Sequence, residues 1–91
     1  MRVYSKRRAR EIPAGAVYVG RPTVWGNPFV VGVDGKQGEC VEMFRKWIMS
    51  SEQDQLRATA RVVLAGKDLV CWCAPLPCHA DVLMEIANDG R

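Results

Sequence analysis

The chain has 91 residues, a length that accommodates one domain and no second one. Apolar residues make up 48% and charged residues 25%, values that exclude a disordered, collagen-like or coiled-coil chain. No apolar run approaches the roughly 20 residues of a membrane span, and the basic N-terminal segment lacks the apolar stretch of a signal peptide. We therefore expect a globular, cytoplasmic protein without a membrane partner.

The formal net charge of +3 is concentrated near the N-terminus. The first ten positions carry five basic residues and no acidic one: Arg2, Lys6, Arg7, Arg8 and Arg10. We interpret residues 1–12 as a basic tail and residues 13–91 as a single α/β domain. Such a tail can contact nucleic acid or an acidic protein, or stay in solvent. Tyr4 is the one aromatic residue in it, so the tail by itself lacks the stacking platform of a single-strand binder.

The first predicted elements after the tail are two short strands joined by a loop. Residues 16–19 (AVYV) are apolar and β-prone, which predicts a buried strand. Residues 20–29 (GRPTVWGNPF) hold two glycines and two prolines, which forbids a regular helix and predicts a structured loop. Residues 29–33 are predicted to form a second, edge strand that ends at the turn of Asp34 and Gly35.

A different periodicity begins after this turn and predicts helices. Over residues 38–49, apolar side chains recur every three or four positions, as on one face of a helix. A second helix is predicted after Ser51 and Asp54, which resemble a capping box, and it should end at Gly66.

The last two predicted elements are a strand over residues 68–73, apolar on both faces, and a helix over residues 78–88. The order of strands and helices predicts a small, single α/β domain with about three helices. Its two- to three-stranded sheet should be mostly parallel, with residues 16–19 and 68–73 as neighbours joined through a helical crossover.

Two loops are expected to meet at one edge of this sheet. Both follow the carboxyl ends of neighbouring parallel strands, where open α/β sheets bind ligands. The residues predicted to bind a ligand there are Gly20, Arg21, Trp25, Gly26, Asn27 and Asp81. Glycine permits close approach, Arg21 offers a planar cationic fork and Trp25 a stacking face. The alternative is a rigid turn in which Trp25 and Phe29 fill the core and Asn27 bonds the backbone.

The start of the third helix carries a candidate nucleophile. Pro77 precedes it, and the free amides of a first turn attract anions and favour a thiolate. Cys78 is accordingly a candidate catalytic nucleophile with His79 as base or proton donor. In the alternative interpretation, Asp81 satisfies the helix dipole and Cys78 is a small apolar core residue. The sequence leaves open whether the domain is an enzyme.

Four cysteines stand at positions 40, 71, 73 and 78. Without a secretory signal, reduced thiols are expected rather than disulfides. Cys71, Cys73, Cys78 and His79 are all zinc-ligand types. On an extended strand, however, Cys71 and Cys73 lie about 6.5 Å apart, whereas two sulfurs on one zinc ion lie about 3.8 Å apart. We therefore expect no cofactor, and a structural zinc ion held by these four residues is the alternative.

Two segments together resemble a known family. Residues 17–32 (VYVGRPTVWGNPFVVG) and 66–83 (GKDLVCWCAPLPCHADVL) are similar to the signature of domain of unknown function 4326, found in small phage and bacterial proteins. The resemblance implies a phage setting, and hence the cytoplasm of a host cell, but no reaction. Similar proteins often have an arginine where Lys36 or Gln37 stands here. If that arginine contributes charge to the pocket in those proteins, the role of the position in this chain is in doubt.

Three functions remain open on the sequence alone. The first is a small-molecule binding domain that holds an anionic or nucleotide-like ligand between the two loops. The second is a phage accessory protein that binds a host macromolecule, either a protein or a nucleic acid through the basic tail. The third is a structural zinc domain. A sheet of so few strands has an exposed edge, so a homodimer would be unsurprising.

Overall fold

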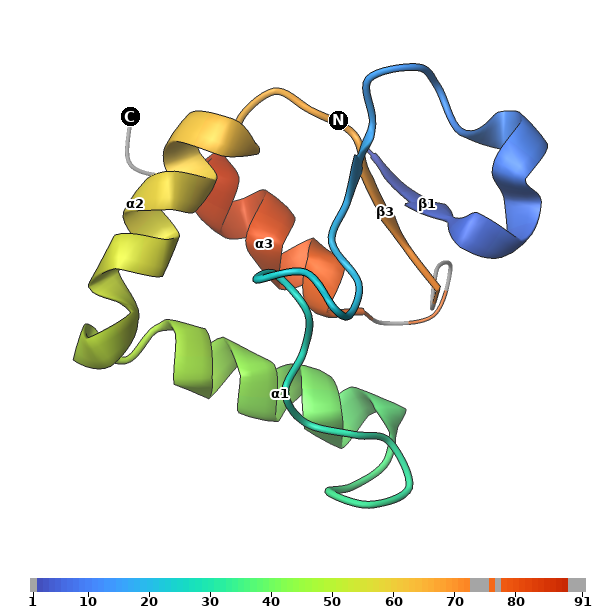
Figure 1. Ribbon diagram of the computed structural model, residues 1–91. Coiled ribbons are helices and arrows are strands. Elements are labelled where there is room, and N and C mark those ends of the chain that lie inside the picture. Colours follow the sequence, from blue (N-terminus) through green and yellow to red (C-terminus); the bar gives the residue numbers. More distant parts are fainter. Residues whose placement is uncertain (1, 73–75, 77, 89–91) are drawn as a thin grey trace.

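Three parallel strands form one sheet (Figure 1). The computed structural model describes residues 2–72, 76 and 78–88. The strands are β1 (Val3–Ser5), β2 (Val17–Tyr18) and β3 (Leu69–Cys71), in the spatial order β1-β3-β2. Both outer strands pair with β3, so that Val3 and Val17 flank Leu69. The predicted parallel pairing of residues 16–19 with residues 68–73 is confirmed for Val17–Tyr18 against Leu69–Val70, and position 73 lies outside the described residues.

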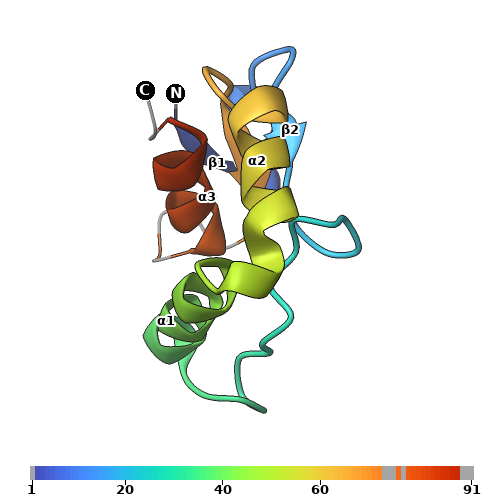
Figure 2. The same cartoon turned by 90° about the vertical axis from the view of Figure 1, so that its left-hand side faces the viewer.

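Three α-helices complete the architecture: α1 (Gln37–Ile48), α2 (Asp54–Val63) and α3 (His79–Ala87). α3 packs against β3, and both α1 and α2 pack against α3. Figures 1 and 2 both show α1 below the other two helices, reached by a segment that descends from the sheet. The protein is therefore a small α/β domain with a parallel sheet, as predicted. No helix within the described ranges is long and apolar enough to cross a bilayer.

α1 forms where the apolar residues recur at helical spacing. Cys40, Phe44 and Ile48 lie one turn apart on the same face, and all three are buried. The first turn is closed by Glu39, whose Oε1 accepts a hydrogen bond of 2.8 Å from the backbone N–H of Lys36. Periodicity and cap together place this helix close to its predicted bounds of 38–49.

α2 begins in a different way from the prediction. The capping box of Ser51 and Asp54 does not form, because Ser51–Gln53 is a 3-10 turn and α2 starts at Asp54 itself. The Asp54 carboxylate contacts the guanidinium of Arg57 in the next turn. The predicted glycine C-cap at Gly66 is wrong: α2 ends at Val63 with Leu64 as its C-cap, and Gly66, at φ +73°, turns the chain two residues after that cap.

The predicted strand over residues 29–33 is wrong. This segment is a loop in which a single bridge joins Val31 to Gly35. Its backbone groups are used locally, since the amides of Val33 and Asp34 both donate to the carbonyl of Val30. Gly32, at φ +89°, turns the chain back before a ladder can extend. The apolar run is therefore no guide to burial here, and Val33 is 80% exposed.

β1 was not predicted, because its three residues lie within the segment interpreted as a basic tail. The strand forms because β3 offers it an edge: the Leu69 amide donates to the carbonyl of Arg2 over 2.9 Å. The Asp68 carboxylate in turn accepts from the Arg2 amide, also over 2.9 Å. A 3-10 segment, η1 (Lys6–Glu11), follows β1 directly and carries four of the five basic residues of the first ten positions.

Candidate functional site

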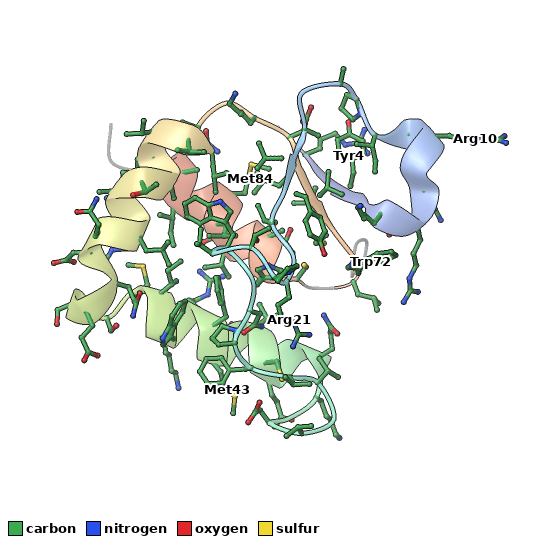
Figure 3. The ribbon with its side chains drawn as sticks, in the orientation of Figure 1. Tyr4, Arg10, Arg21, Met43, Trp72 and Met84 are labelled. Atoms are coloured by element: carbon green, nitrogen blue, oxygen red, sulfur yellow. The ribbon has the colours of Figure 1, made fainter. Side chains whose placement is uncertain are left out.

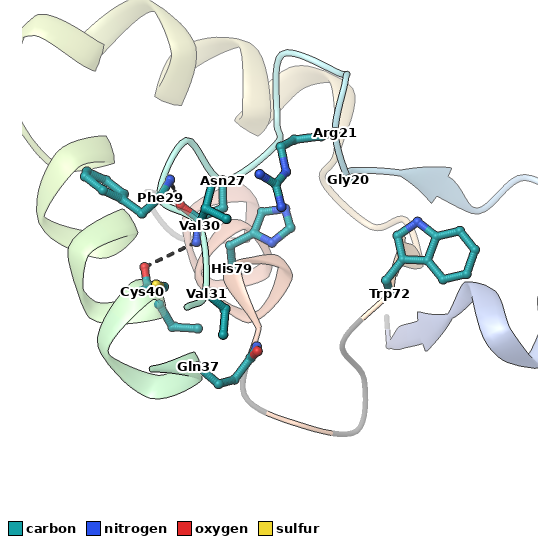
Figure 4. A pocket seen from close by; sticks show the side chains of 11 residues that line it. Gly20, Arg21, Asn27, Phe29, Val30, Val31, Gln37, Cys40, Trp72 and His79 are labelled. Carbon is teal, nitrogen blue, oxygen red and sulfur yellow. Dashed lines mark hydrogen bonds between the residues drawn. The ribbon is translucent and has the colours of Figure 1, made fainter. Parts of the chain in front are cut away.

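A pocket of about 180 Å³ lies at the carboxyl edge of the sheet (Figure 4). Its polar lining comes from distant parts of the sequence. Arg21 and Asn27 belong to the loop after β2, Gln37 opens α1 and His79 opens α3. Apolar and aromatic residues complete the wall: Phe29, Val30, Val31, Cys40, Val41 and Trp72. The two loops do meet, as the sequence predicted, and leave a hollow between them.

The loop that carries Arg21 is shaped by two successive turns. The Thr23 amide donates to the Gly20 carbonyl, and the Gly26 amide donates to the Thr23 carbonyl, each over 3.0 Å. The Arg21–Pro22 peptide bond is cis. A Cβ atom at position 26 would lie 2.7 Å from the Arg21 Cγ, so glycine at this position makes room for the arginine.

Asn27 fixes the end of the same loop to α1. Its Oδ1 accepts a hydrogen bond of 2.9 Å from the Phe29 amide, and its Nδ2 donates to the Cys40 carbonyl over 3.2 Å. Asn27 therefore bonds the backbone, as the alternative interpretation of this loop as a rigid turn proposed. Asn27 therefore shapes the pocket wall even without a ligand.

Arg21 supplies the fixed positive charge of the pocket. Among the described residues, no carboxylate forms an ion pair with its guanidinium. Figure 4 shows that guanidinium beside the imidazole of His79. A guanidinium thus lies beside an imidazole at the carboxyl edge of the sheet, and its charge favours a bound anion.

His79 is 7% exposed, and the protein holds its ring from several sides. Nε2 lies 2.7 Å from the Val19 carbonyl oxygen, and Nδ1 lies 3.5 Å from the Cys78 Sγ. Because a carbonyl only accepts, Nε2 carries the proton of the neutral ring and Nδ1 faces the thiol as an acceptor. The ring of Phe44 meets the imidazole edge-on, with centroids 5.2 Å apart.

The pKa of His79 lies below its ordinary value of 6.5. Burial is the largest cause, since it disfavours the charged imidazolium. The hydrogen bond to the Val19 carbonyl raises the pKa, the neighbouring Arg21 guanidinium lowers it, and the Asp81 carboxylate raises it. The net result is a neutral histidine at pH 7.

Cys78 and Asp81 lie outside the pocket lining. Together they cap α3, because the Cys78 Sγ accepts from the Ala80 amide over 3.5 Å and the Asp81 Oδ2 accepts from the Cys78 amide over 3.1 Å. Cys78 is 1% exposed, and its Sγ lies 2.9 Å from that of Cys71. The helix start is thus satisfied from within, and a nucleophilic role for Cys78 stays a prediction.

Of the other predicted ligand-binding residues, some line the pocket and others do not. Gly20 lines the pocket beside Arg21, whereas Gly26 lies outside the lining and leaves room for the Arg21 side chain. Trp25 is 6% exposed and belongs to the hydrophobic core, as the rigid-turn alternative proposed. The structure therefore brings Gly20, Arg21, Asn27 and His79 together and leaves Trp25 elsewhere.

Sequence reasoning missed the aromatic residue at the pocket, Trp72. It is 51% exposed, an unusual state for a tryptophan. Its Nε1 donates to the Tyr18 hydroxyl over 3.0 Å, and that hydroxyl donates to the Arg21 carbonyl over 2.9 Å. Tyr18 thereby connects the end of β3 to the first loop. The available signal was the position of Trp72 at the end of a buried strand.

The four residues of the zinc alternative do not form a metal site within the part of the chain that the structure describes. The sulfurs of Cys71 and Cys78 are closer, at 2.9 Å, than the about 3.8 Å that separates two sulfurs on one zinc ion. The His79 Nε2 is engaged by the Val19 carbonyl. Cys73 lies outside the described residues, within which no three metal-ligating side chains cluster. The donor atoms that are described do not fit a tetrahedral zinc ion.

The low pKa of His79 predicts a pH-dependent stability. Below pH 6.5 the unfolded chain binds a proton that the folded protein resists, so the free energy of unfolding should fall as pH decreases through this range. Above that pH the contribution should be constant. Urea unfolding from about pH 5 to 7.5 measures it. His79→Gln keeps a donor near the Val19 carbonyl and cannot titrate, so its profile should be flatter; a profile as steep as that of the wild type would contradict the assignment.

Comparison with known proteins places the chain in a family. Residues 3–89 match the family described as Domain of unknown function (DUF4326). An "Uncharacterized 12.4 kDa protein in nrdA-td intergenic region" of Enterobacteria phage T4 is 35% identical over 74 residues, which cover 79% of this chain and 67% of the phage protein. No solved structure matches the chain. The chain therefore belongs to the DUF4326 family, an uncharacterised family of small domains with a phage member.

Proposed function

We propose that this domain binds a small anionic, nucleotide-like ligand, with the anionic group in the pocket beside Arg21 and His79. The observation that carries the proposal is the Arg21 guanidinium, which lines the pocket and pairs with no described carboxylate. A guanidinium presents its donors in a planar fork that matches phosphate and carboxylate oxygens. An anion would supply the missing partner.

The size of the pocket suggests which part of the ligand enters it. Its 180 Å³ is smaller than the about 300–1,000 Å³ of sites that enclose a whole drug-sized molecule. A phosphate or carboxylate group fits this volume, and the rest of the ligand would extend beyond it. In Figure 4, Arg21 and His79 lie between Asn27 on one side and Trp72 on the other. The half-exposed indole offers a flat surface for a base.

The imidazole of His79 provides a direct readout of binding. An anion placed beside it would stabilise the charged imidazolium and raise the pKa of His79 from its lowered value. The sequence contains one histidine, so its ring resonances in a proton NMR spectrum are assigned without further work.

The test is an NMR titration of the His79 ring with inorganic phosphate, adenosine monophosphate and, as the uncharged probe, adenosine. We expect both anions to cause a saturable shift and to raise the pKa of His79, with adenosine monophosphate binding more tightly. Arg21→Ala should weaken phosphate binding by about tenfold or more, since a charge-assisted hydrogen bond is worth roughly 1.5–3 kcal/mol. Arg61→Ala removes the same charge from the exposed face of α2 and should change nothing.

Two results would refute the proposal. One is the absence of any shift with phosphate or adenosine monophosphate up to ~10 mM, beyond the range of a specific weak site. The other is an equal response in the Arg21→Ala and wild-type proteins, which would remove the guanidinium from the site.

A further inference from the structure

We infer that the carboxyl edge of the sheet binds single-stranded nucleic acid, with one phosphate in the Arg21 pocket, a base on Trp72 and further phosphates along η1. This inference rests on the proposed function and names its substrate class. The sequence offered no aromatic platform beside the basic residues other than Tyr4. The fold brings one there from a position far along the chain.

The strand register places three features side by side. Ser5 pairs with Cys71, so the residues that follow them, Lys6 and Trp72, leave the sheet next to each other. Tyr18 pairs with Val70 on the other side of β3, and the loop after it leads to the Arg21 pocket. Because the order is β1-β3-β2, the basic segment, the indole and the pocket follow one another across the edge. Two strand spacings of about 4.8 Å separate its ends, roughly 10 Å in all.

Direct contacts join the three features. The Lys6 Nζ lies 5.0 Å from the centre of the Tyr18 ring. The hydroxyl of the same tyrosine accepts from the Trp72 Nε1 and donates to the Arg21 carbonyl. Figure 3 shows Trp72 at the lower end of the sheet, with Arg21 on the side of the helices. Tyr18 thus holds the cation, the indole and the arginine loop in one arrangement.

The charge of this edge is suited to a polyanion. η1 contains four basic residues and one acid in the sequence KRRARE. Arg8 forms an ion pair of 3.8 Å with Glu11, whereas Lys6, Arg7 and Arg10 form none with any described carboxylate. Phosphates would neutralise these charges and release counterions.

Exposed cations that border a half-exposed tryptophan are typical of single-strand binding surfaces. A free mononucleotide would occupy the pocket and Trp72 but leave η1 without a partner. A duplex would satisfy the cations, but its bases are stacked on one another and unavailable to the indole. A single strand uses all three features at once.

The test is fluorescence anisotropy with a labelled oligothymidine of about ten nucleotides, titrated at roughly 50 to 200 mM salt. The double variant Lys6→Ala, Arg7→Ala should bind at least about tenfold more weakly. Its salt slope should fall by about 1.4, or about 0.7 for each lost phosphate contact. The matched control, Arg61→Ala with Lys67→Ala, removes the same charge from α2 and from the amino end of β3, and its salt slope should equal that of the wild type.

Trp72 has its own pair of variants. Trp72→Ala should weaken oligothymidine binding by roughly five- to a hundredfold, the usual range for loss of one stacked base. Trp72→Phe loses the hydrogen bond to Tyr18 but keeps an aromatic face, so it should bind nearly as well as the wild type. Near-equal losses in both variants would show a structural role for the indole and would count against the inference.

Other outcomes would overturn the inference, and the His79 titration then shows whether the proposed function fails with it. Equal losses in the η1 variant and its control, equal affinity for duplex DNA, or equally tight binding of a poly-glutamate peptide would each contradict it. If the His79 resonance still responds to adenosine monophosphate in that case, the pocket remains a mononucleotide site. If that response is also absent, the proposed function fails as well.

Discussion

Replacing Phe44 by alanine is expected to lower the free energy of unfolding by about 3–5 kcal/mol. The side chain, on α1, is fully buried in the core and packs against the start of α3. Its ring centroid lies 5.7 Å from that of Trp47 and 5.2 Å from that of His79. A domain of this length has a total stability of roughly 5–14 kcal/mol, so the loss would be a large fraction of it.

Urea unfolding of the Phe44→Ala protein measures this loss directly. The control is Met43→Ala, the neighbouring position on α1, where the side chain is 36% exposed and the cost should stay below about 1 kcal/mol. Equal costs at the two positions would show that Phe44 is not part of the continuous core. Since the phenyl ring also contacts His79, the alanine variant should in addition broaden or move the histidine resonance.

Replacing Gly26 by alanine is expected to weaken anion binding at least as much as removing the Arg21 guanidinium itself. The new Cβ would lie 2.7 Å from the Arg21 Cγ and 3.1 Å from its backbone Cα and N. Because two of these neighbours are backbone atoms, the loop must shift and carry the guanidinium away from the pocket. Overpacking of this kind usually costs about 1–3 kcal/mol of stability, so the protein should still fold.

The measurements are the His79 titration with phosphate and the urea unfolding curve. Gly38→Ala serves as the control, because that glycine lies inside α1 and a Cβ there would meet no atom within 4 Å. It should leave phosphate binding unchanged and raise stability by roughly 0.5–1 kcal/mol. Wild-type binding in the Gly26→Ala protein would mean that the loop does not position Arg21 for the ligand.

The sequence was most informative where periodicity and caps agree. α1 and α3 appear close to their predicted bounds because each has an apolar face at helical spacing and a capping residue at its start. The meeting of the two loops could also be predicted, since parallel neighbours send their carboxyl ends to the same edge. That geometry is enough to bring Arg21, Asn27 and His79 into one pocket.

The remaining features depend on tertiary contacts that local patterns do not encode. The three residues of β1 become a strand because β3 offers them an edge. Residues 29–33 are apolar, yet glycine turns and local hydrogen bonds keep them out of the sheet. Trp25 lies in a loop rich in glycine and proline, and Trp72 lies at the end of an apolar strand, yet the first is buried and the second is half-exposed. Which of them lines the pocket therefore depends on the fold.

The pairing of β1 with β3 also decides how the basic segment should be studied. Deleting residues 1–10 would remove its positive charges and would also strip a strand from β3. The Leu69 amide would lose the carbonyl of Arg2, and side chains now nearly sealed from water at Val70 and Cys71 would be left at an open margin. A truncated chain that failed to retain nucleic acid would therefore report a damaged scaffold as readily as a missing contact. Single substitutions of exposed cations separate the two effects, and any affinity tag is better attached away from the first strand.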